Sequence, residues 1–290
     1  MNRRAAVLAM LMLPAGVRRG RAGVSPVQDP GRWTPIFNGR DLTAWETFLG
    51  KPHKLVEVPG QTRDERGEYL NAIGVDSDSK RVFSVVQMDG GPVIRISGEI
   101  YGALTTRAEY ENYHLRFDFK WGEQKWPPRE QALRDSGCCY HAVGPHGASY
   151  GFWMQAFEFQ IQEGDCGDFY SLAGVIVDAE GDPVKPGDPK TDLTYRKGAS
   201  KVVGHTRRII KDSGNEKPHG QWNTLDLYCL GQTSVHVVNG TPNMVLSGLR
   251  RKVDGRDVPL TKGRIQFQSE GAEVFYRNIA IRSTRQIPWK

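Results

Sequence analysis

Hydrophobic and polar side chains alternate one by one along much of this chain. In residues 114–121, HLRFDFKW, the apolar Leu, Phe, Phe and Trp are separated by Arg, Asp and Lys. The same period of two recurs in SGCCYHAV, FEFQIQ, TLDLYCL, SVHVV, RIQFQSE and VFYRNIAIR. Such alternation is typical of β-strands with one packed face and one polar face. Helical periodicity is nowhere sustained over three turns, so the chain is predicted to be all-β.

The connections predict how these strands are arranged. Asn239-Gly240 stands between two extended runs, which is the usual signal of a tight hairpin. Many half-buried strands without crossover helices favour antiparallel sheets stacked face to face. We therefore expect one domain with a two-sheet sandwich or jelly-roll architecture, a size that 290 residues can fill. Two long loops, residues 123–135 and 178–201, are expected to be functional or flexible.

The stretch FEFQIQ, residues 157–162, carries unusual polar positions for its strand pattern. Alternation places Glu158, Gln160 and Gln162 on one face and the aromatic and aliphatic side chains on the other. The polar face is either a solvated sheet surface or the floor of a binding cleft. These two interpretations require different surroundings for Glu158.

Charge is concentrated at the start of the sequence. The formal net charge is +6, but five arginines and no acid lie in the first 22 residues, and the rest of the chain carries only +1. This balance argues against a nucleic-acid partner. The basic start and short apolar run predict a signal peptide and leader over residues 1–27, with a domain over 28–290 and a secreted or periplasmic location. The apolar run is too short to span a membrane. A basic tail on a cytosolic protein is the alternative.

Four cysteines fit an oxidising compartment if the chain is exported. Cys138 and Cys139 are adjacent in a predicted strand and should point to opposite faces, so they are not expected to pair with each other. A disulfide between one of them and Cys166 is the preferred pairing, although four cysteines permit three full pairings. The absence of a CxxC spacing argues against a structural zinc site.

Several segments in a fixed order carry a family resemblance. They are FNGRDLTAW (37–45), YGALTTRAEYENYHLRFDFKW (101–121), DSGCCYH (135–141), FEFQIQE (157–163), GQWNTLDLY (220–228), VNGTPN (238–243) and GRIQFQSEGAEVFYRNIAIR (263–282). Together they resemble the 3-keto-disaccharide hydrolase domain family over roughly residues 33–282. The resemblance implies a concanavalin-like jelly roll and action on glycosides whose sugar is oxidised at carbon 3.

The chain departs from this family at several positions. The family often has Arg where this chain has His141, and His where it has Glu270, and Cys138 and Cys139 replace an apolar pair. The stretch EFQIQE also resembles the catalytic strand of laminarinase-type retaining glycosidases, but Gln160 stands where those enzymes have Asp. Retaining hydrolysis needs two placed carboxylates. The sequence therefore disfavours a classical endoglycosidase.

A 3-keto-glycoside can be cleaved with fewer groups. The carbonyl acidifies the hydrogen on carbon 2, so one base, one electrophile near the keto oxygen and one acid for the leaving oxygen suffice. Glu158 is the candidate base and Gln160 is expected to orient a sugar hydroxyl. His141 is the candidate acid or enolate partner. Glu158, His141 and a nearby Asp could also hold a divalent cation, but no ligand spacing assigns one, so the metal stays open and no other cofactor is indicated.

Other side chains are candidates for binding the substrate. Aromatic faces can cover the C–H groups of a sugar ring, and polar residues on neighbouring strands can reach the same cleft. These candidates are Trp126, Trp153, Asp118, Lys120, Gln268 and Glu270. For each, packing in the core, anchoring of a loop or an exposed ion pair is the alternative.

The leading hypothesis is an exported, carbohydrate-active hydrolase or lyase that cleaves 3-keto-glycosides or disaccharides. A lectin-like carbohydrate-binding module without catalysis is the alternative, because fold alone does not decide function.

Overall fold

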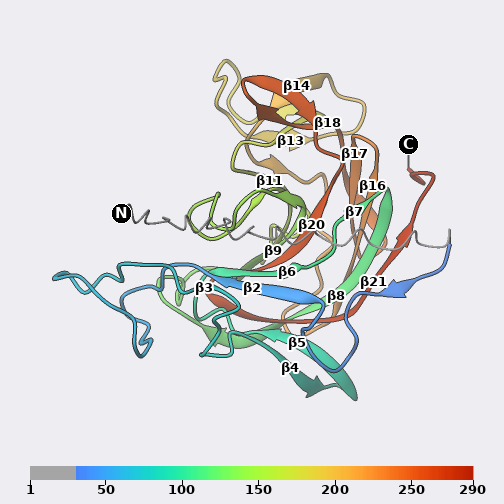
Figure 1. The fold of residues 1–290 in the computed structure, drawn as a ribbon. Helices are drawn as coiled ribbons and strands as arrows, with labels where there is room; N and C mark the ends of the chain where they lie inside the picture. The colour runs from blue at the N-terminus through green and yellow to red at the C-terminus, as the bar shows by residue number, and fades with distance from the viewer. Residues whose placement is uncertain (1–30, 290) are drawn as a thin grey trace, which may run out of the picture.

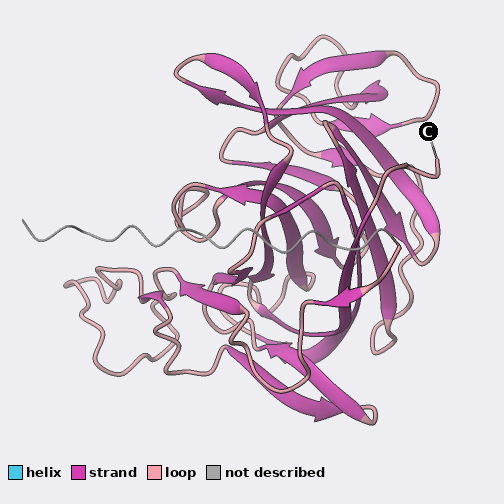
Figure 2. Ribbon diagram, turned by 45° about the vertical axis from the view of Figure 1, so that its right-hand side comes forward, coloured by secondary structure: helices cyan, strands magenta, loops and turns pink. Residues whose placement is uncertain are grey.

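The computed structural model describes residues 31–289, in which the chain forms strands, turns and loops but no helix (Figure 2). The predicted leader, residues 1–27, lies outside this part. Over the same residues no segment forms a helix long and apolar enough to cross a membrane.

One layer of the sandwich, called the first layer here, carries the FEFQIQ strand between β9 and β11, both of which are labelled in Figure 1. Its neighbouring strands pair antiparallel, except that β13 and β15 are parallel. The short β7, Tyr110–Glu111, pairs with the start of β20. In spatial order the first layer contains β3 (Gly74–Val75), β2 (Trp45–Leu49), β6 (Gly102–Thr106), β20 (Lys262–Ser269), β9 (Asp135–Val143), β10 (Gln155–Gln162), β11 (Phe169–Leu172), β15 (Ile209–Ile210) and β13 (Leu193–Tyr195).

The second layer is antiparallel throughout and packs against the first. The short β1, Thr34–Pro35, pairs with β21, and β19, Arg256–Pro259, pairs with β18. In spatial order this layer contains β4 (Phe83–Met88), β5 (Gly91–Ile96), β21 (Ala272–Ser283), β8 (Tyr113–Lys125), β16 (Asn223–Leu230), β17 (Thr233–Val238), β18 (Thr241–Val253), β12 (Ile176–Pro183) and β14 (Lys201–His205). The pairing of β12 with β13 links the layers. The predicted two-sheet antiparallel sandwich is confirmed.

The core lies between the layers and is built by the period-two pattern. Phe267 of the first layer packs against Phe117 and Tyr276 of the second, with ring centroids 5.0 and 4.4 Å apart. Phe157 and Phe159 of β10 also point inward and are fully buried. Aromatic side chains of this size contribute a large share of the burial that stabilises a sandwich. The opposite face of the first layer, called the outer face here, is therefore the face of Glu158.

The predicted disulfide is wrong, because all four cysteines are free thiols in buried positions. Alternation does place Cys138 and Cys139 on opposite faces: Cys138 joins the main core, whereas Cys139 packs with Trp153 on the outer face. Cys166 belongs to the main core as well. Burial in apolar surroundings raises the pKa of these thiols, so they act as small core residues.

Candidate active site

A cavity of about 240 Å³ lies over the outer face of the first layer, above β9, β10 and β11. Its wall combines carboxyl groups, one guanidinium, carboxamides and aromatic rings. The lining residues are Arg129, Asp135, Tyr150, Trp153, Glu158, Gln160, Gln162, Tyr170, Ser171, Leu172 and Glu270. A concave site with converging polar groups is where a small ligand is expected to bind.

Strand register brings the polar side chains together. Gln162 of β10 lies opposite Asp135 of β9. Glu158 lies four residues before Gln162, on the same face of β10. Gly137 stands between them and provides the room, because a Cβ atom there would lie 2.3 Å from Oε1 of Glu158 and 2.5 Å from Oε1 of Gln268. The Ser-Gly pair of DSGCCYH thus has a steric role in forming the cavity floor.

Three carboxyl groups of the cavity share one electrostatic environment. Burial raises the pKa of Glu158 well above its ordinary value, and the charge of Asp135 raises it further. The pKa of Glu270 is also raised well above its ordinary value, first by burial of the carboxyl group and then by the charges of Asp135 and Glu158. Part of the surface of this residue is nevertheless exposed. Burial raises the pKa of Asp135 to about 7. Such a set can hold and release protons near neutral pH.

Asp135 is the carboxyl with the most direct partners. Arg129 Nη2 lies 2.8 Å from its Oδ2, and Gln162 Nε2 donates a hydrogen bond of 2.7 Å to the same oxygen. Both contacts favour the ionised form and oppose the effect of burial. The second Asp135 oxygen and Nε of Arg129 are buried without a partner among the described residues.

The raised pKa of Asp135 predicts an inverted pH dependence of stability. Because its folded pKa of about 7 exceeds the ordinary 3.8, its contribution is fully present below about pH 4 and is lost as pH rises to about 7. We expect wild type to lose up to about 4 kcal/mol of unfolding free energy relative to Asp135→Asn between these pH values. Urea unfolding across this range measures the difference. Equal pH slopes for the two proteins would contradict it.

Four predicted site residues lie at or beside the cavity. Glu158, Gln160 and Trp153 line it, as does Glu270. Gln160 bends back so that its Oε1 accepts a hydrogen bond of 3.0 Å from the backbone of Ile161. Trp153 is buried and donates from Nε1 to the carbonyl of Gly102, so it forms a fixed wall.

Gln268 lies next to Glu158 beneath the cavity lining. The Gln268 side chain lies close to the Glu158 carboxyl but does not form a hydrogen bond of ordinary geometry with it. Its proximity lowers the Glu158 pKa by less than burial raises it. Both polar atoms of the Gln268 side chain are buried without a hydrogen-bond partner among the described residues. Such a group can take a partner when the cavity is filled.

The structure does not bring His141 to Glu158, which corrects the predicted pairing. Strict alternation from Cys139 would place His141 on the outer face, but the register of β9 shifts against both neighbours at this point. His141 has a left-handed backbone, with φ of +50°, and its ring turns into the core beside Tyr113 and Phe157. A bulge of this kind reverses which face a side chain occupies.

The environment of His141 also opposes the predicted acid role. The ring is fully buried, and Nδ1 lies 3.1 Å from the carbonyl oxygen of Leu260. Burial lowers its pKa to about 4, so the imidazole is neutral at pH 7. A metal set of Glu158 and His141 is excluded by the same placement. No group of three His, Cys, Asp or Glu side chains between residues 31 and 289 is arranged to hold a metal ion.

Asp118 and Lys120 are likewise placed away from the cavity. Both lie on β8 of the second layer, on the face opposite its core residues. Asp118 binds Arg277 and Thr224, and Lys120 pairs with Asp89 at 3.0 Å. The expectation that they share a cleft with Glu158 is therefore corrected in favour of surface ion pairs.

Trp126 anchors the loop that carries Arg129, and it is absent from the cavity lining. Its Nε1 donates to the carbonyl of Ser97 at 3.0 Å, and its backbone nitrogen donates to Gly271. The loop between β8 and β9, residues 126–134, thus reaches the site through Arg129, whereas Trp126 holds the loop in place.

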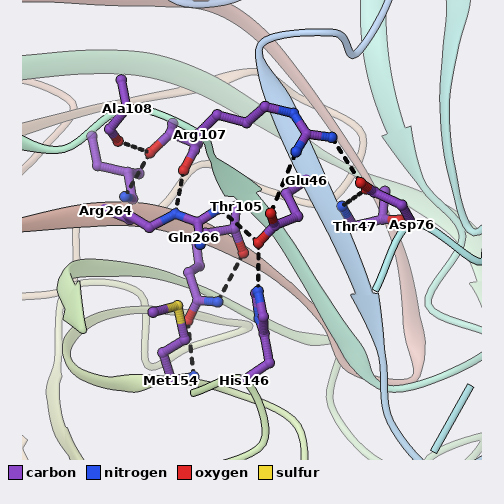
Figure 3. A network of polar contacts seen from close by, with 12 residues as sticks. Glu46, Thr47, Asp76, Thr105, Arg107, Ala108, His146, Met154, Arg264 and Gln266 are labelled. Carbon is purple, nitrogen blue, oxygen red and sulfur yellow. Dashed lines mark hydrogen bonds and ion pairs between the residues drawn. The ribbon is translucent and has the colours of Figure 1, made fainter. Parts of the chain in front are cut away.

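A second polar network fixes another wall of the same layer (Figure 3). Oε1 of Glu46 lies 2.7 Å from Nε2 of His146 and 2.8 Å from Nη2 of Arg264. Nearby, Oε1 of Gln266 accepts a hydrogen bond from the backbone of Met154 at 3.1 Å. These contacts tie down both ends of residues 146–154, the segment that supplies Tyr150 and Trp153 to the cavity. The network supports the site and does not line it.

Sequence reasoning missed Arg129, Asp135, Tyr150 and Tyr170 as site residues. Asp135 was within the recognisable DSGCCYH segment, and its spacing of two residues to Gly137 and four to Cys139 placed it on the same strand face, which was a usable signal. Tyr170 lies opposite Glu158 across β10 and β11, a pairing that depends on register. Arg129 had only the length of its loop as a signal, and Tyr150 lies in neither of the two long loops that the sequence indicated.

The sequence matches the model of a known family. The family model of the 3-keto-alpha-glucoside-1,2-lyase-like domain matches residues 32–282. The chain belongs to this family. As a member of the 3-keto-alpha-glucoside-1,2-lyase-like domain family, it is a carbohydrate-active, glycosyl-hydrolase-like protein, and a sugar is its class of ligand. A search of curated proteins found no match.

Solved structures from several bacteria align with this chain. A candidate glycosyl hydrolase of Parabacteroides distasonis is 19% identical, with 87% of this chain and 99% of that chain covered and a TM-score of 0.44. A β-glucanase of Bacillus licheniformis is 11% identical, with coverages of 90% and 100% and a TM-score of 0.41. The carbohydrate-binding module CBM66 of Bacillus subtilis is 8% identical, with coverages of 69% and 92% and a TM-score of 0.39.

Proposed function

We propose that this family member cleaves 3-keto-glycosides by elimination at carbons 1 and 2, followed by addition of water. The observation that carries the proposal is the cavity itself, in which Glu158, Glu270 and Asp135 have raised pKa values beside Arg129. Neighbouring titratable groups of this kind can divide the acid and base roles of one reaction.

The reaction needs one proton taken and one proton given. A base removes the hydrogen on carbon 2, and the electron pair moves into the enolate formed with the keto group at carbon 3. The enolate re-forms the carbonyl as the bond from carbon 1 to the leaving oxygen breaks, and an acid protonates that oxygen. Water then adds its hydroxyl to carbon 1 and its proton to carbon 2, which gives the 3-keto sugar.

Glu158 is the proposed base. A carboxylate with a raised pKa is a stronger base than an exposed one, and burial provides that increase here. Glu270 is the proposed acid, since burial and then the charges of Asp135 and Glu158 raise its pKa, so that an ionised Glu158 favours a proton on Glu270. Arg129 is the proposed partner of the enolate oxygen, because it is the one cationic residue among those that line the cavity. Gln160, which lines the cavity, provides a carboxamide for a sugar hydroxyl.

Retaining hydrolysis by two carboxylates is less well supported. Glu163, the other acid of EFQIQE, pairs with Arg134 at 2.9 Å and is absent from the cavity lining. Gln160 occupies the intervening position and cannot act as a nucleophilic carboxylate. The proposal therefore does not use the laminarinase pattern.

The fate of the hydrogen on carbon 2 tests the elimination route. Turnover of a 3-keto-glucoside in D₂O is expected to place deuterium at carbon 2 of the released 3-keto sugar in the first minutes. Direct displacement at carbon 1 would retain protium there. The product incubated in D₂O without protein controls for spontaneous exchange. Early product that retains its original hydrogen would contradict elimination.

The proposal also places the reaction outside the cytoplasm. Its support is the basic and apolar leader over residues 1–27. Fractionation of cells that express the full chain tests it, and recovery of the uncleaved chain in the cytoplasm would contradict it.

A further inference from the structure

Two glutamines lie two residues apart on the outer face of β20, and they differ in their hydrogen bonds. Gln266 is fully buried; its Oε1 accepts from the backbone of Met154 at 3.1 Å, and its Nε2 donates to Oγ1 of Thr105 at 2.9 Å (Figure 3). Gln268 is also fully buried, but neither polar atom of its side chain has a hydrogen-bond partner among the described residues. A buried carboxamide without partners costs free energy, so its presence points to a role other than stability.

Strand register brings Gln268 to Glu158. Phe267 of β20 pairs with Cys138 of β9. The next residues along the two strands, Gln268 and Gly137, are therefore neighbours. Gly137 has no side chain, and a Cβ atom there would lie 2.5 Å from Oε1 of Gln268 and 2.3 Å from Oε1 of Glu158. The carboxamide and the carboxyl thus approach each other over Gly137, from the two strands on either side of β9.

The Gln268 carboxamide acts on Glu158 against two opposing effects. Burial and the charge of Asp135 raise the pKa of Glu158, and the approach of Gln268 lowers it. Arg129, the cation nearest these carboxyl groups, contacts Asp135 at 2.8 Å. The titratable or charged groups that face Glu158 are Asp135 and Cys139 of β9, Tyr170 of β11, Glu270 after β20 and Arg129 of the loop before β9.

We propose that Gln268 is a positioning residue, which holds Glu158 in both of its protonation states by turning its carboxamide. When Glu158 is ionised, Nε2 of Gln268 donates to the carboxylate. After Glu158 has taken the proton from carbon 2, its O–H donates to Oε1 of Gln268. A half-turn about the last side-chain bond exchanges the donor and acceptor ends without changing the shape of the carboxamide. This role rests on the proposed function for the proton that Glu158 takes, whereas the contact itself does not.

Gln268→Met tests this role, because it keeps the length of the side chain and removes both polar ends. A hydrogen bond to a charged group is about twice as strong as one between neutral groups, so the ionised form of Glu158 loses more than the protonated form. We expect the proton affinity of Glu158 to rise about tenfold, which moves its titration to higher pH by about one unit. For a 3-keto-glucoside, kcat should fall about tenfold with KM much less affected, and the acidic limb of the pH profile should move to higher pH.

Gln266→Met is the matched control, because Gln266 is equally buried on the same strand face. It loses two ordinary hydrogen bonds, so it should unfold at lower urea concentration without a shift of the acidic limb. Gln268→Met should unfold close to wild type, since the carboxamide that it removes has no ordinary partner. If the methionine variant does not fold, Gln268→Leu provides the same loss of polar atoms.

Infrared spectroscopy separates this role from the proposed reaction, because it needs no substrate. The C=O band of the protonated Glu158 carboxyl is the one lost in Glu158→Gln, and its intensity is followed against pH in wild type and in both methionine variants. A midpoint that rises only in Gln268→Met supports the role; if no keto substrate is turned over as well, the proposed reaction alone fails. Turnover with an unmoved midpoint, or the same shift in Gln266→Met, would retain the reaction and overturn the role of Gln268.

Discussion

Glu158→Gln is expected to lower turnover of a 3-keto-glucoside by about 10² to 10⁴, the usual contribution of a positioned general base. The glutamine has the shape of the protonated glutamic acid, so the cavity and its affinity for the sugar should be retained. Since Glu158 has a raised pKa in the folded protein, removing its ionisation should not weaken the fold at neutral pH. Steady-state kinetics and sugar binding on the same preparation measure both effects.

Glu216→Gln is the matched control for this variant. Glu216 is also a half-buried carboxyl whose pKa is raised by burial, but it binds Trp121 and the backbone of Gly164 outside the cavity. We expect it to retain most of the turnover. A Glu158→Gln protein with more than about one tenth of wild-type turnover would remove Glu158 from the role of base.

Arg129→Gln is expected to lower turnover by about 10² to 10³, comparable to removing one donor from an oxyanion site. It should also change the pH profile. The Arg129 charge lowers the pKa of Asp135 and of Glu270, so its loss raises both. If base catalysis requires an ionised carboxylate of this set, the acidic limb of the profile moves to higher pH. Because the groups interact, the limb reports the set rather than one residue.

Arg134→Gln distinguishes this effect from disruption of the loop. Arg134 lies in the same loop but binds Glu163 and the carbonyl of Gly122, away from the cavity. It is expected to affect stability without moving the acidic limb. An unchanged pH profile for Arg129→Gln, or the same shift for Arg134→Gln, would contradict the assigned role of Arg129.

The sandwich could be predicted from the sequence because alternation is a local property. The alternation within a stretch such as residues 157–162 predicts which face of the strand is buried, and the core forms where those faces pack together. The bulge at His141 could not be predicted in the same way. Its left-handed backbone depends on the fit of β9 to β10 and β20, which are distant in sequence.

The site was predictable only where it lies on one strand. Glu158 and Gln160 share the face of β10 by alternation, and the structure places both at the cavity. Asp135 joins them through register, and Arg129 joins through a loop whose course is set by contacts with Ser97 and Gly271. Asp118 has the same local pattern as Glu158 but lies on the other layer. Period two identifies a polar face but does not tell which layer carries it.

The measurement that tests the central claim most directly is release of the leaving group from a synthetic 3-keto-glucoside and from its unoxidised parent, by wild-type protein. The proposal predicts release from the keto substrate only. Release from the parent would contradict elimination and favour ordinary hydrolysis. No release from either, together with binding of a glycan, would contradict catalysis and identify a lectin-like binding module.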